Sequence, residues 1–161
     1  MALTLSSPDF SHQQAIPSTF TCEGRDISPA LSWTDPPEGT KSFALVVDDP
    51  DAPDPARPER VWVHWVIYDL PPATRGLPQG VEGTGLLPAG TRQGKNDWKR
   101  VGYNGPCPPI GRHRYFVKLF ALDCVLPDLE KPTKARLEQA MEGHMLASAE
   151  LMGTYEKSGR G

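Results

Sequence analysis

Side chains that can bind or react are concentrated in three short segments of the sequence. The first is the acidic, proline-containing run 48–53, the second is centred on His64, and the third is the glycine- and proline-rich run 103–115. Carboxylate, imidazole and phenol groups occur in these segments, and together they can donate and accept hydrogen bonds to a polar ligand. The first and third segments border predicted strands, where loops normally carry functional residues.

Each segment also has a structural explanation. Acidic residues that follow a strand commonly accept backbone N–H bonds in a turn, whereas a loop stiffened by proline could instead hold Asp49 against a pocket. A single histidine in a strand, such as His64, is usually a packed and hydrogen-bonded core residue. The third segment favours a pocket, because His113 and Tyr115 are two residues apart in a predicted strand and must point to the same face.

The elements that must position these side chains are mostly strands. Five apolar runs rich in β-branched and aromatic residues are predicted strands. They are 42–47, 62–68 and 115–122, and more weakly 3–6 and 29–33. The first of these strands is expected to end abruptly at Asp48. Alternation in the second places His64 on the same face as Val66 and Tyr68.

The connections between the strands favour an antiparallel sandwich. The stretches 50–58 and 71–92 are studded with proline and glycine. They lack the 3.6-residue periodicity of the crossover helices that a parallel sheet requires. The sequence therefore predicts a mostly β protein.

Helices are predicted only near the C-terminal end. Thr133 is the expected N-cap of one helix, which Gly143 breaks or kinks, and His144 is expected on its apolar face as a packing or capping residue. A second helical turn or two over 145–152 should end at Gly153, in the position of a C-cap glycine.

Length and charge limit the possible functions. The chain has 161 residues and fits one domain spanning 1–161. Its net charge of -3 gives no general argument for nucleic acid or anionic membranes as partners. Seven basic residues stand in 92–118 against Asp97 alone; this stretch could attract an anion or could simply be a solvated face.

The cysteines and the N-terminal residues predict a cytoplasmic location. Cys22, Cys107 and Cys124 are an odd number at unrelated spacings, which suggests neither a disulfide framework nor a CxxC metal site. Reduced thiols fit the cytoplasm. The first residues also lack the basic and apolar regions of a signal peptide, and no segment approaches the length of a membrane span.

Several motifs together resemble the phosphatidylethanolamine-binding protein family, which includes Raf kinase inhibitor protein. They are the run 49–53, Trp62 with His64, and the stretch from Gly105-Pro106 to His113-Arg114-Tyr115. Four further runs are most similar to the short bacterial and archaeal branch of that family. These are 20–24, 27–29, 105–109, and 143–146 together with 150–151.

The resemblance implies a two-sheet antiparallel β-sandwich of Greek-key type with an anion pocket at one end. Family members bind phosphate-like anions in this pocket, and eukaryotic members bind phosphoethanolamine head groups and inhibit kinases or proteases. A regulatory or inhibitor-type ligand-binding protein is therefore implied. Matched position by position, the pocket would be lined by Asp49, Pro53, His64, Gly105, Pro106, His113 and Tyr115.

The residue types themselves are suited to an anion. Two imidazoles and a phenol supply N–H and O–H donors, and Gly105 could expose a backbone N–H because it lacks a Cβ. Asp49 is expected either to accept a hydrogen bond from His64 or His113, which would raise the pKa of that histidine, or to pair with the ammonium of a head group. Anion affinity should then rise as the pH falls through the histidine range.

Other functions are less favoured by the sequence. Catalysis is not expected, because GxSxG, Walker and HExxH motifs are missing, and no metal or cofactor is expected. One alternative is an inhibitor whose loops 50–58 and 106–109 cover the active site of a protease or kinase. The apolar aromatic strands leave a symmetric homodimer plausible. A minor alternative is a zinc site formed by Asp49, His64, Cys107 and His113.

Overall fold

The computed structural model describes residues 2–81 and 87–157, which form two antiparallel β-sheets. The smaller sheet has the order β1-β2-β5, with β1 (Thr4–Ser6), β2 (Leu31–Thr34) and β5 (Gly76–Leu77). The larger sheet has the order β6-β4-β3-β7-β8, with β6 (Arg92–Gln93), β4 (Arg60–Leu70), β3 (Ser42–Ala52), β7 (His113–Leu122) and β8 (Met145–Tyr155). A 3-10 helix, η1 (Ser18–Phe20), and the helix α1 (Lys134–Met141) complete these elements. Within the described ranges, no helix is long and apolar enough to cross a membrane.

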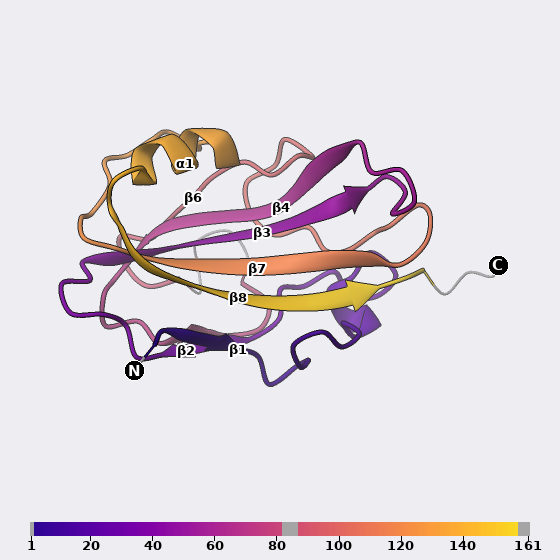
Figure 1. Ribbon diagram of the computed structural model, residues 1–161, viewed down its shortest axis with the longest axis horizontal. Helices are drawn as coiled ribbons and strands as arrows, with labels where there is room; N and C mark the ends of the chain where they lie inside the picture. The colour runs from indigo at the N-terminus through magenta and orange to yellow at the C-terminus, as the bar shows by residue number, and fades with distance from the viewer. Residues whose placement is uncertain (1, 82–86, 158–161) are drawn as a thin grey trace.

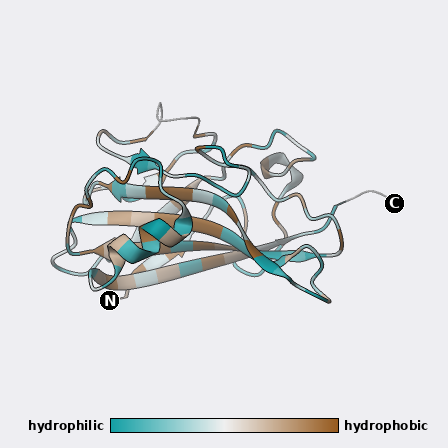
Figure 2. Cartoon of the chain, turned by 90° about the horizontal axis from the view of Figure 1, so that it is seen from above, coloured by the Kyte–Doolittle hydropathy of each residue, from teal (hydrophilic) through white to brown (hydrophobic). Residues whose placement is uncertain are grey.

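The two sheets and α1 form three layers. The helix lies on one face of the larger sheet, and the smaller sheet lies on the other (Figure 1). One apolar core, which includes Trp33 and Phe43, fills the space between the sheets, and a second includes Leu137 and Met141 of α1. Apolar bands run along the central strands, whereas polar residues predominate in many of the surrounding loops (Figure 2). The predicted mostly β, two-sheet antiparallel architecture is confirmed.

The central strand β3 is longer than predicted. It does not end at Asp48 but continues through the acidic run, with Asp49 opposite Trp62 of β4. The buried carboxylate of Asp48 forms ion pairs with Lys118 of β7 and Lys134, the first residue of α1. Cations on neighbouring elements can compensate for the hydration that a buried carboxylate loses. The predicted end at Asp48 is therefore wrong, because these partners are remote in the sequence.

A β-bulge on β4 changes the direction of His64. The register between β3 and β4 shifts at this residue, which is the extra residue of the bulge. Such a bulge re-aims side chains. His64 and Trp65 both face the side of the sheet that carries Tyr115, whereas Val66 and Tyr68 belong to the core under α1. Strict alternation placed His64 on the face of Val66 and Tyr68, and that prediction is wrong.

The segment after α1 is a strand and not a second helix. The side chain of Thr133 accepts a hydrogen bond from the Arg136 N–H, as expected of an N-cap, and α1 ends at Met141. Gly143 follows with a φ of +80°, which favours glycine. The chain then forms β8, which pairs with β7 along its whole length. Residues 145–152 favour a helix locally, but the pairing with β7 overrides that preference.

Two residues that were expected in helices have other roles. His144 lies outside α1 with a half-exposed side chain, so it is not an apolar packing residue of the helix. Gly153 lies within β8 opposite Tyr115, and a Cβ atom there would come within 2.5 Å of Ile16 Cγ1. Glycine at this position allows the N-terminal segment to pass close to the strand.

Cys22 and Cys107 form a disulfide, with their Cα atoms 5.4 Å apart. The bond joins the loop after η1 to the loop that precedes β7, and the Cys22 N–H donates to the Pro106 carbonyl oxygen at 3.1 Å beside it. The expectation of reduced thiols is therefore wrong for this pair, whereas Cys124 is free. The two cysteines are separated by 85 residues, so only the fold brings them together.

Removal of the disulfide should lower stability. We expect the free energy of unfolding of the Cys22→Ser/Cys107→Ser double variant to fall by about 4 kcal/mol, because a long loop is no longer constrained in the unfolded chain. Urea denaturation under non-reducing conditions measures the change. Cys124→Ser is the matched control and should change stability by less than about 0.5 kcal/mol. Equal stability of the double variant and the wild type would contradict a stabilising role for the bond.

Candidate functional site

A cavity of about 270 Å³ lies where β3 and β4 meet the beginning of β7. It brings together most of the predicted site residues, namely Asp49, Pro53, His64, His113 and Tyr115. The other lining residues are not among the seven predicted for the anion pocket, although Cys107 was named in the zinc alternative and the loops 50–58 and 106–109 in the inhibitor alternative. They are Ala52, Arg60, Trp62, Trp98, Cys107, Pro108 and Pro109. The cavity thus combines titratable groups with aromatic and proline side chains.

Gly105 and Pro106 do not line this cavity. The backbone N–H of Gly105 donates to Asp26 Oδ1 at 2.7 Å, so it is not exposed to a ligand as expected. A Cβ atom at Gly105 would lie 2.1 Å from the Phe20 carbonyl oxygen, which shows that glycine serves a close backbone approach. Pro106 lines a separate apolar hollow beside Phe10 and Ile16.

Asp49 and His113 form a buried hydrogen-bonded pair. Nδ1 of His113 lies 2.5 Å from Oδ2 of Asp49, and the two side chains are 0% and 4% exposed. Nε2 of His113 donates to the carbonyl oxygens of Pro53, at 3.0 Å, and Ile110, at 2.9 Å. Because a carbonyl oxygen only accepts, Nε2 carries a proton, and a second proton lies between Nδ1 and Asp49. The pair therefore has no net charge, and both ring nitrogens of His113 are already engaged.

The carboxyl groups of Asp49 and Asp51 are held in different ways. Burial raises the pKa of Asp49, although hydrogen bonds from His113 and from the Asp51 N–H oppose this effect. Asp51 instead accepts hydrogen bonds from Arg114, with Nη2 at 2.8 Å and Nε at 3.0 Å, and these bonds lower its pKa. Asp51 is thus an ionised structural partner of β7, whereas Asp49 faces the cavity.

His64 is a buried histidine in its neutral form. Its Nδ1 donates to the Asn104 carbonyl oxygen at 2.6 Å, and its ring makes edge contacts with Trp98 and Tyr115. Burial lowers the pKa of His64 to about 4, more than the hydrogen bonds to Asn104 and Gly105 raise it. With the proton on Nδ1, Nε2 is an acceptor at neutral pH. Asp49 is bonded to His113, so the expected pKa increase does not occur at His64.

Tyr115 carries a polar atom that has no internal partner. The residue is 2% exposed, and its hydroxyl makes no hydrogen bond of normal geometry to any described residue, although it lies near enough to the Asp49 carboxyl to interact with it. Its ring stacks on His113, with centroids 6.3 Å apart and an interplanar angle of 18°, so the two side chains share a face as predicted. Burial and the nearby Asp49 charge raise the pKa of Tyr115, so the hydroxyl remains a donor. A buried donor of this kind requires a ligand or water.

One functional loop was missed by sequence reasoning. Trp98 and the carbonyl that binds His64 both belong to the loop 96–104, which is organised by the buried side chain of Asn96. The amide of Asn96 donates to the Gly102 carbonyl and accepts from the Trp98 N–H. The only available signal was the turn-forming pair Asn-Asp directly before a tryptophan.

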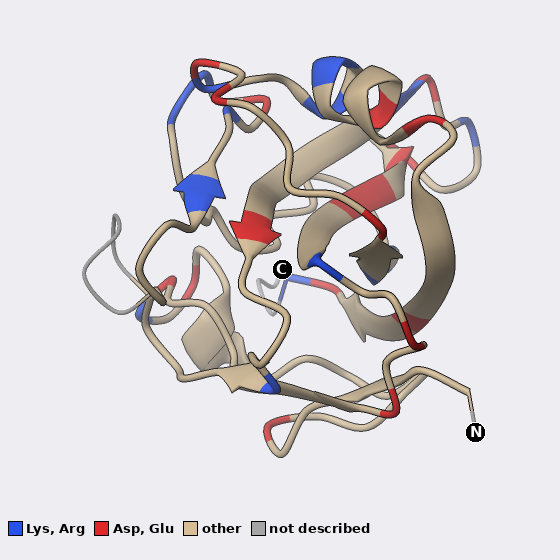
Figure 3. Cartoon of the chain, turned by 90° about the vertical axis from the view of Figure 1, so that its left-hand side faces the viewer, with Lys and Arg blue, Asp and Glu red and all other residues tan. Residues whose placement is uncertain are grey.

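The cation beside the cavity is not from the basic stretch 92–118. Within that stretch, Arg92, Arg112, Arg114 and Lys118 form ion pairs with acidic residues. The basic side chain that lines the cavity is Arg60, which forms an ion pair with the exposed Glu59 at 3.6 Å. Figure 3, which shows the molecule from the left-hand side of Figure 1, has acidic and basic residues interspersed over loops and strand ends.

The zinc alternative at this cavity is contradicted by the bonding of two of its ligands. Cys107 is joined to Cys22 and has no thiolate to offer. His113 binds Asp49 through one nitrogen and main-chain carbonyls through the other. The four residues therefore do not form the expected ligand set.

Comparisons with known proteins agree with this architecture. A UPF0098 protein of Methanothermobacter thermautotrophicus is 49% identical over 156 residues, which cover 96% of this chain and 99% of the relative. The crystal structure of a phosphatidylethanolamine-binding protein homologue of Chlamydia trachomatis has a TM-score of 0.88 and 44% identity, covering 97% of this chain and 98% of that one. YbcL of Escherichia coli has a TM-score of 0.87 and 32% identity, covering 98% and 99%.

A family-wide comparison leads to the same assignment. Residues 6–156 match the sequence profile described as phosphatidylethanolamine-binding protein. The match covers every strand except the first two residues of β1, and it includes α1 and all of the residues that line the cavity. The chain belongs to the phosphatidylethanolamine-binding protein family.

Proposed function

We propose that the cavity binds a small anion, best represented by the phosphate of a phosphorylated head group, and that the protein has a regulatory ligand-binding role. The hydroxyl of Tyr115 carries this proposal, because it is a buried donor that no described residue satisfies. A phosphate oxygen can accept its hydrogen bond. Arg60 adds a cation at the cavity, and the neutral Asp49–His113 pair does not add a net negative charge.

The lining residues favour a phosphate that carries an organic substituent. Trp62 and Trp98 are in edge contact, with ring centroids 5.5 Å apart, and both line the cavity. Aromatic rings bind apolar groups and ammonium groups well. A phosphorylated amine therefore uses more of the cavity than inorganic phosphate does.

We also propose that the cavity binds without catalysing a reaction. The groups best suited to nucleophilic or acid–base chemistry are Cys107 and His113, and both are engaged in bonds within the protein. Neutral His64, with a pKa of about 4, is a weak base.

The hydroxyl of Tyr115 gives the sharpest test of the site. We expect Tyr115→Phe to weaken the binding of inorganic phosphate and phosphoethanolamine by at least about tenfold, since a charge-assisted hydrogen bond is lost. The free energy of unfolding should not fall, because the hydroxyl has no internal partner among the described residues. Calorimetric titration and urea denaturation measure the two quantities.

Tyr155→Phe is the matched control for this prediction. Its hydroxyl bonds to Glu23 and does not line the cavity. This variant should lose about 1 kcal/mol of stability and keep its phosphate affinity. If Tyr115→Phe binds phosphate as tightly as the wild type, the anion does not occupy this cavity.

The pH dependence of binding should follow the lowered pKa of His64. Folding favours the neutral ring of His64. Its contribution to the free energy of unfolding is therefore fully present above the unfolded pKa of 6.5 and is lost as the pH falls towards 4. An anion offsets this loss by stabilising the protonated ring. We therefore expect sulfate, whose charge is constant in this range, to bind with level affinity between about pH 8 and 6.5 and more tightly towards pH 4.

His64→Asn tests whether His64 is the group that titrates. Asparagine has no side-chain proton that titrates in this range, but its amide can still donate to the Asn104 carbonyl. The variant should lose the rise in sulfate affinity at low pH. A rise that already begins above pH 6.5 in the wild type, or that persists in His64→Asn, would assign the titration to another group. Calorimetry at several pH values provides the measurement.

Inhibition of a protease or kinase through protein contact is a second proposal. Ile110 is 53% exposed, and Pro53, Pro108 and Pro109 line the cavity beside it, so a partner seated there would cover the opening. Co-precipitation from native extract, repeated with excess phosphate, tests the idea. Loss of a captured protease or kinase on addition of phosphate supports it, and the absence of such a partner in both samples opposes it.

The cytoplasmic location and the homodimer stay predictions. The argument from reduced thiols no longer supports the cytoplasm, since Cys22 and Cys107 are bonded and disulfides persist mainly in oxidising compartments. Cell fractionation tests the location, and light scattering during size-exclusion chromatography tests the oligomeric state.

A further inference from the structure

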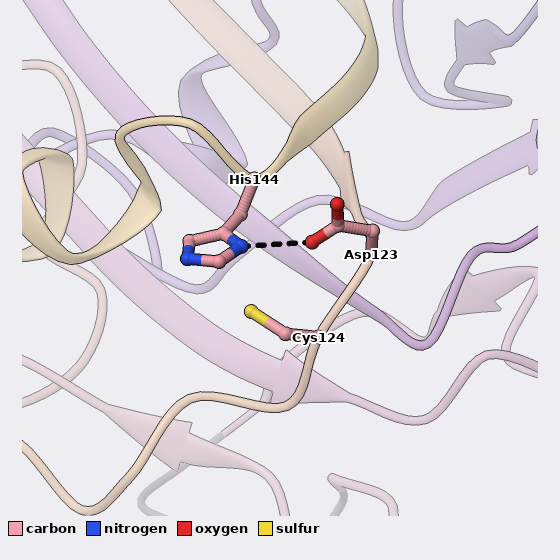
Figure 4. Close-up of side chains that lie close together, drawn as sticks. All are labelled: Asp123, Cys124 and His144. Atoms are coloured by element: carbon pink, nitrogen blue, oxygen red, sulfur yellow. Dashed lines mark hydrogen bonds and ion pairs between the residues drawn. The ribbon is translucent and has the colours of Figure 1, made fainter.

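A second group of potential ligands lies at the other end of β7. Asp123 and Cys124 directly follow the last residue of β7, and His144 directly precedes the first residue of β8 (Figure 4). The cavity is formed at the opposite end, around His113 and Tyr115. Ten residues of extended strand separate the two places by about 30 Å, so this group is independent of the anion site.

The backbone holds the three residues at fixed positions. The N–H of Asp123 donates to the His144 carbonyl oxygen at 3.0 Å, which ties the two segments together. The Ser42 hydroxyl donates to the Cys124 carbonyl oxygen at 2.7 Å, and the His144 N–H donates to the Met141 carbonyl oxygen at 2.9 Å. The side chains therefore start from main-chain positions that the sheet and α1 define.

The side chains converge on one point with three different donor atoms. A carboxylate oxygen, a sulfur and an imidazole nitrogen lie within 4.8 Å of one another. Among the described residues, these are the three His, Cys, Asp or Glu side chains that lie close enough together to hold one metal ion. Nδ1 of His144 lies 2.8 Å from Oδ1 of Asp123. Bonds of about 2.0–2.3 Å to one ion require small movements, which half-exposed side chains make at low cost.

The charges around the sulfur of Cys124 favour a cation. The carboxylates of Asp123 and Asp69 are the charged groups that act on this sulfur. The same carboxylates attract a positive ion, and coordination to a metal removes the thiol proton.

We propose that Asp123, Cys124 and His144 form a binding site for a borderline-soft divalent cation, with Zn²⁺ as the best match. Mixed sulfur, nitrogen and oxygen ligands are typical of zinc. As the metal–sulfur bond forms, the proton of Cys124 leaves to solvent. Three protein ligands leave a fourth position for water, as in open zinc sites.

Cobalt titration of the full-length, untagged protein tests the proposal. Co²⁺ has the same ligand preferences as Zn²⁺ here, and a thiolate ligand gives a sulfur-to-metal charge-transfer band in the near ultraviolet. Cys22 and Cys107 are oxidised, so this band reports Cys124. We expect one Co²⁺ per chain, the charge-transfer band, and its loss when Zn²⁺ is added.

Variants distinguish the site from unspecific binding. Cys124→Ser should abolish the band, and His144→Asn and Asp123→Asn should each weaken Zn²⁺ binding by at least about tenfold. His12→Asn changes another exposed histidine and should have no effect, and Tyr115→Phe should leave metal binding unchanged. Circular dichroism confirms the fold of each variant. Absence of the band in the wild type, or equal Zn²⁺ affinity in His144→Asn and the wild type, would overturn the proposal.

Discussion

The central strand β3 carries three buried aspartates, and each of them must have a partner. Asp48 pairs with Lys118 and Lys134, Asp49 with His113, and Asp51 with Arg114. An unpaired carboxylate at such positions costs several kcal/mol, because the interior does not replace its hydration. All of these partners lie on β7 except Lys134, which begins α1. The requirement for charge compensation therefore fixes β7 beside β3, docks the helix, and places His113 at the cavity.

The same requirement explains why the cavity has few free polar groups. Asp49 and main-chain carbonyls engage both nitrogens of His113, and Asn104 engages Nδ1 of His64. The hydroxyl of Tyr115 is left without a partner among the described residues. An N–H group that is already hydrogen-bonded within the protein is not available to donate to a ligand. The anion that we propose as the ligand therefore meets one buried hydroxyl, a cation at the cavity and aromatic walls, and depends less on imidazolium groups than the residue types suggest.

Loops that are remote in sequence close the site, and covalent and polar bonds hold them. The disulfide between Cys22 and Cys107 anchors the loop before β7, and Cys107 itself lines the cavity. Asn96 organises the loop that carries Trp98 and Asn104. These loops contain few apolar residues to pack, so cross-links and buried amides take the place of a core.

The sequence by itself determined the β architecture and much of the site. Apolar runs such as 42–47 are strands because β-branched and aromatic residues fit a pleated sheet, and period-two geometry was enough to put His113 and Tyr115 on one face. The tertiary structure alone decided the direction of His64, the strand at 145–155 and the disulfide. Each of these depends on register or contact between segments far apart in the chain, and neither local propensity nor alternation contains that information.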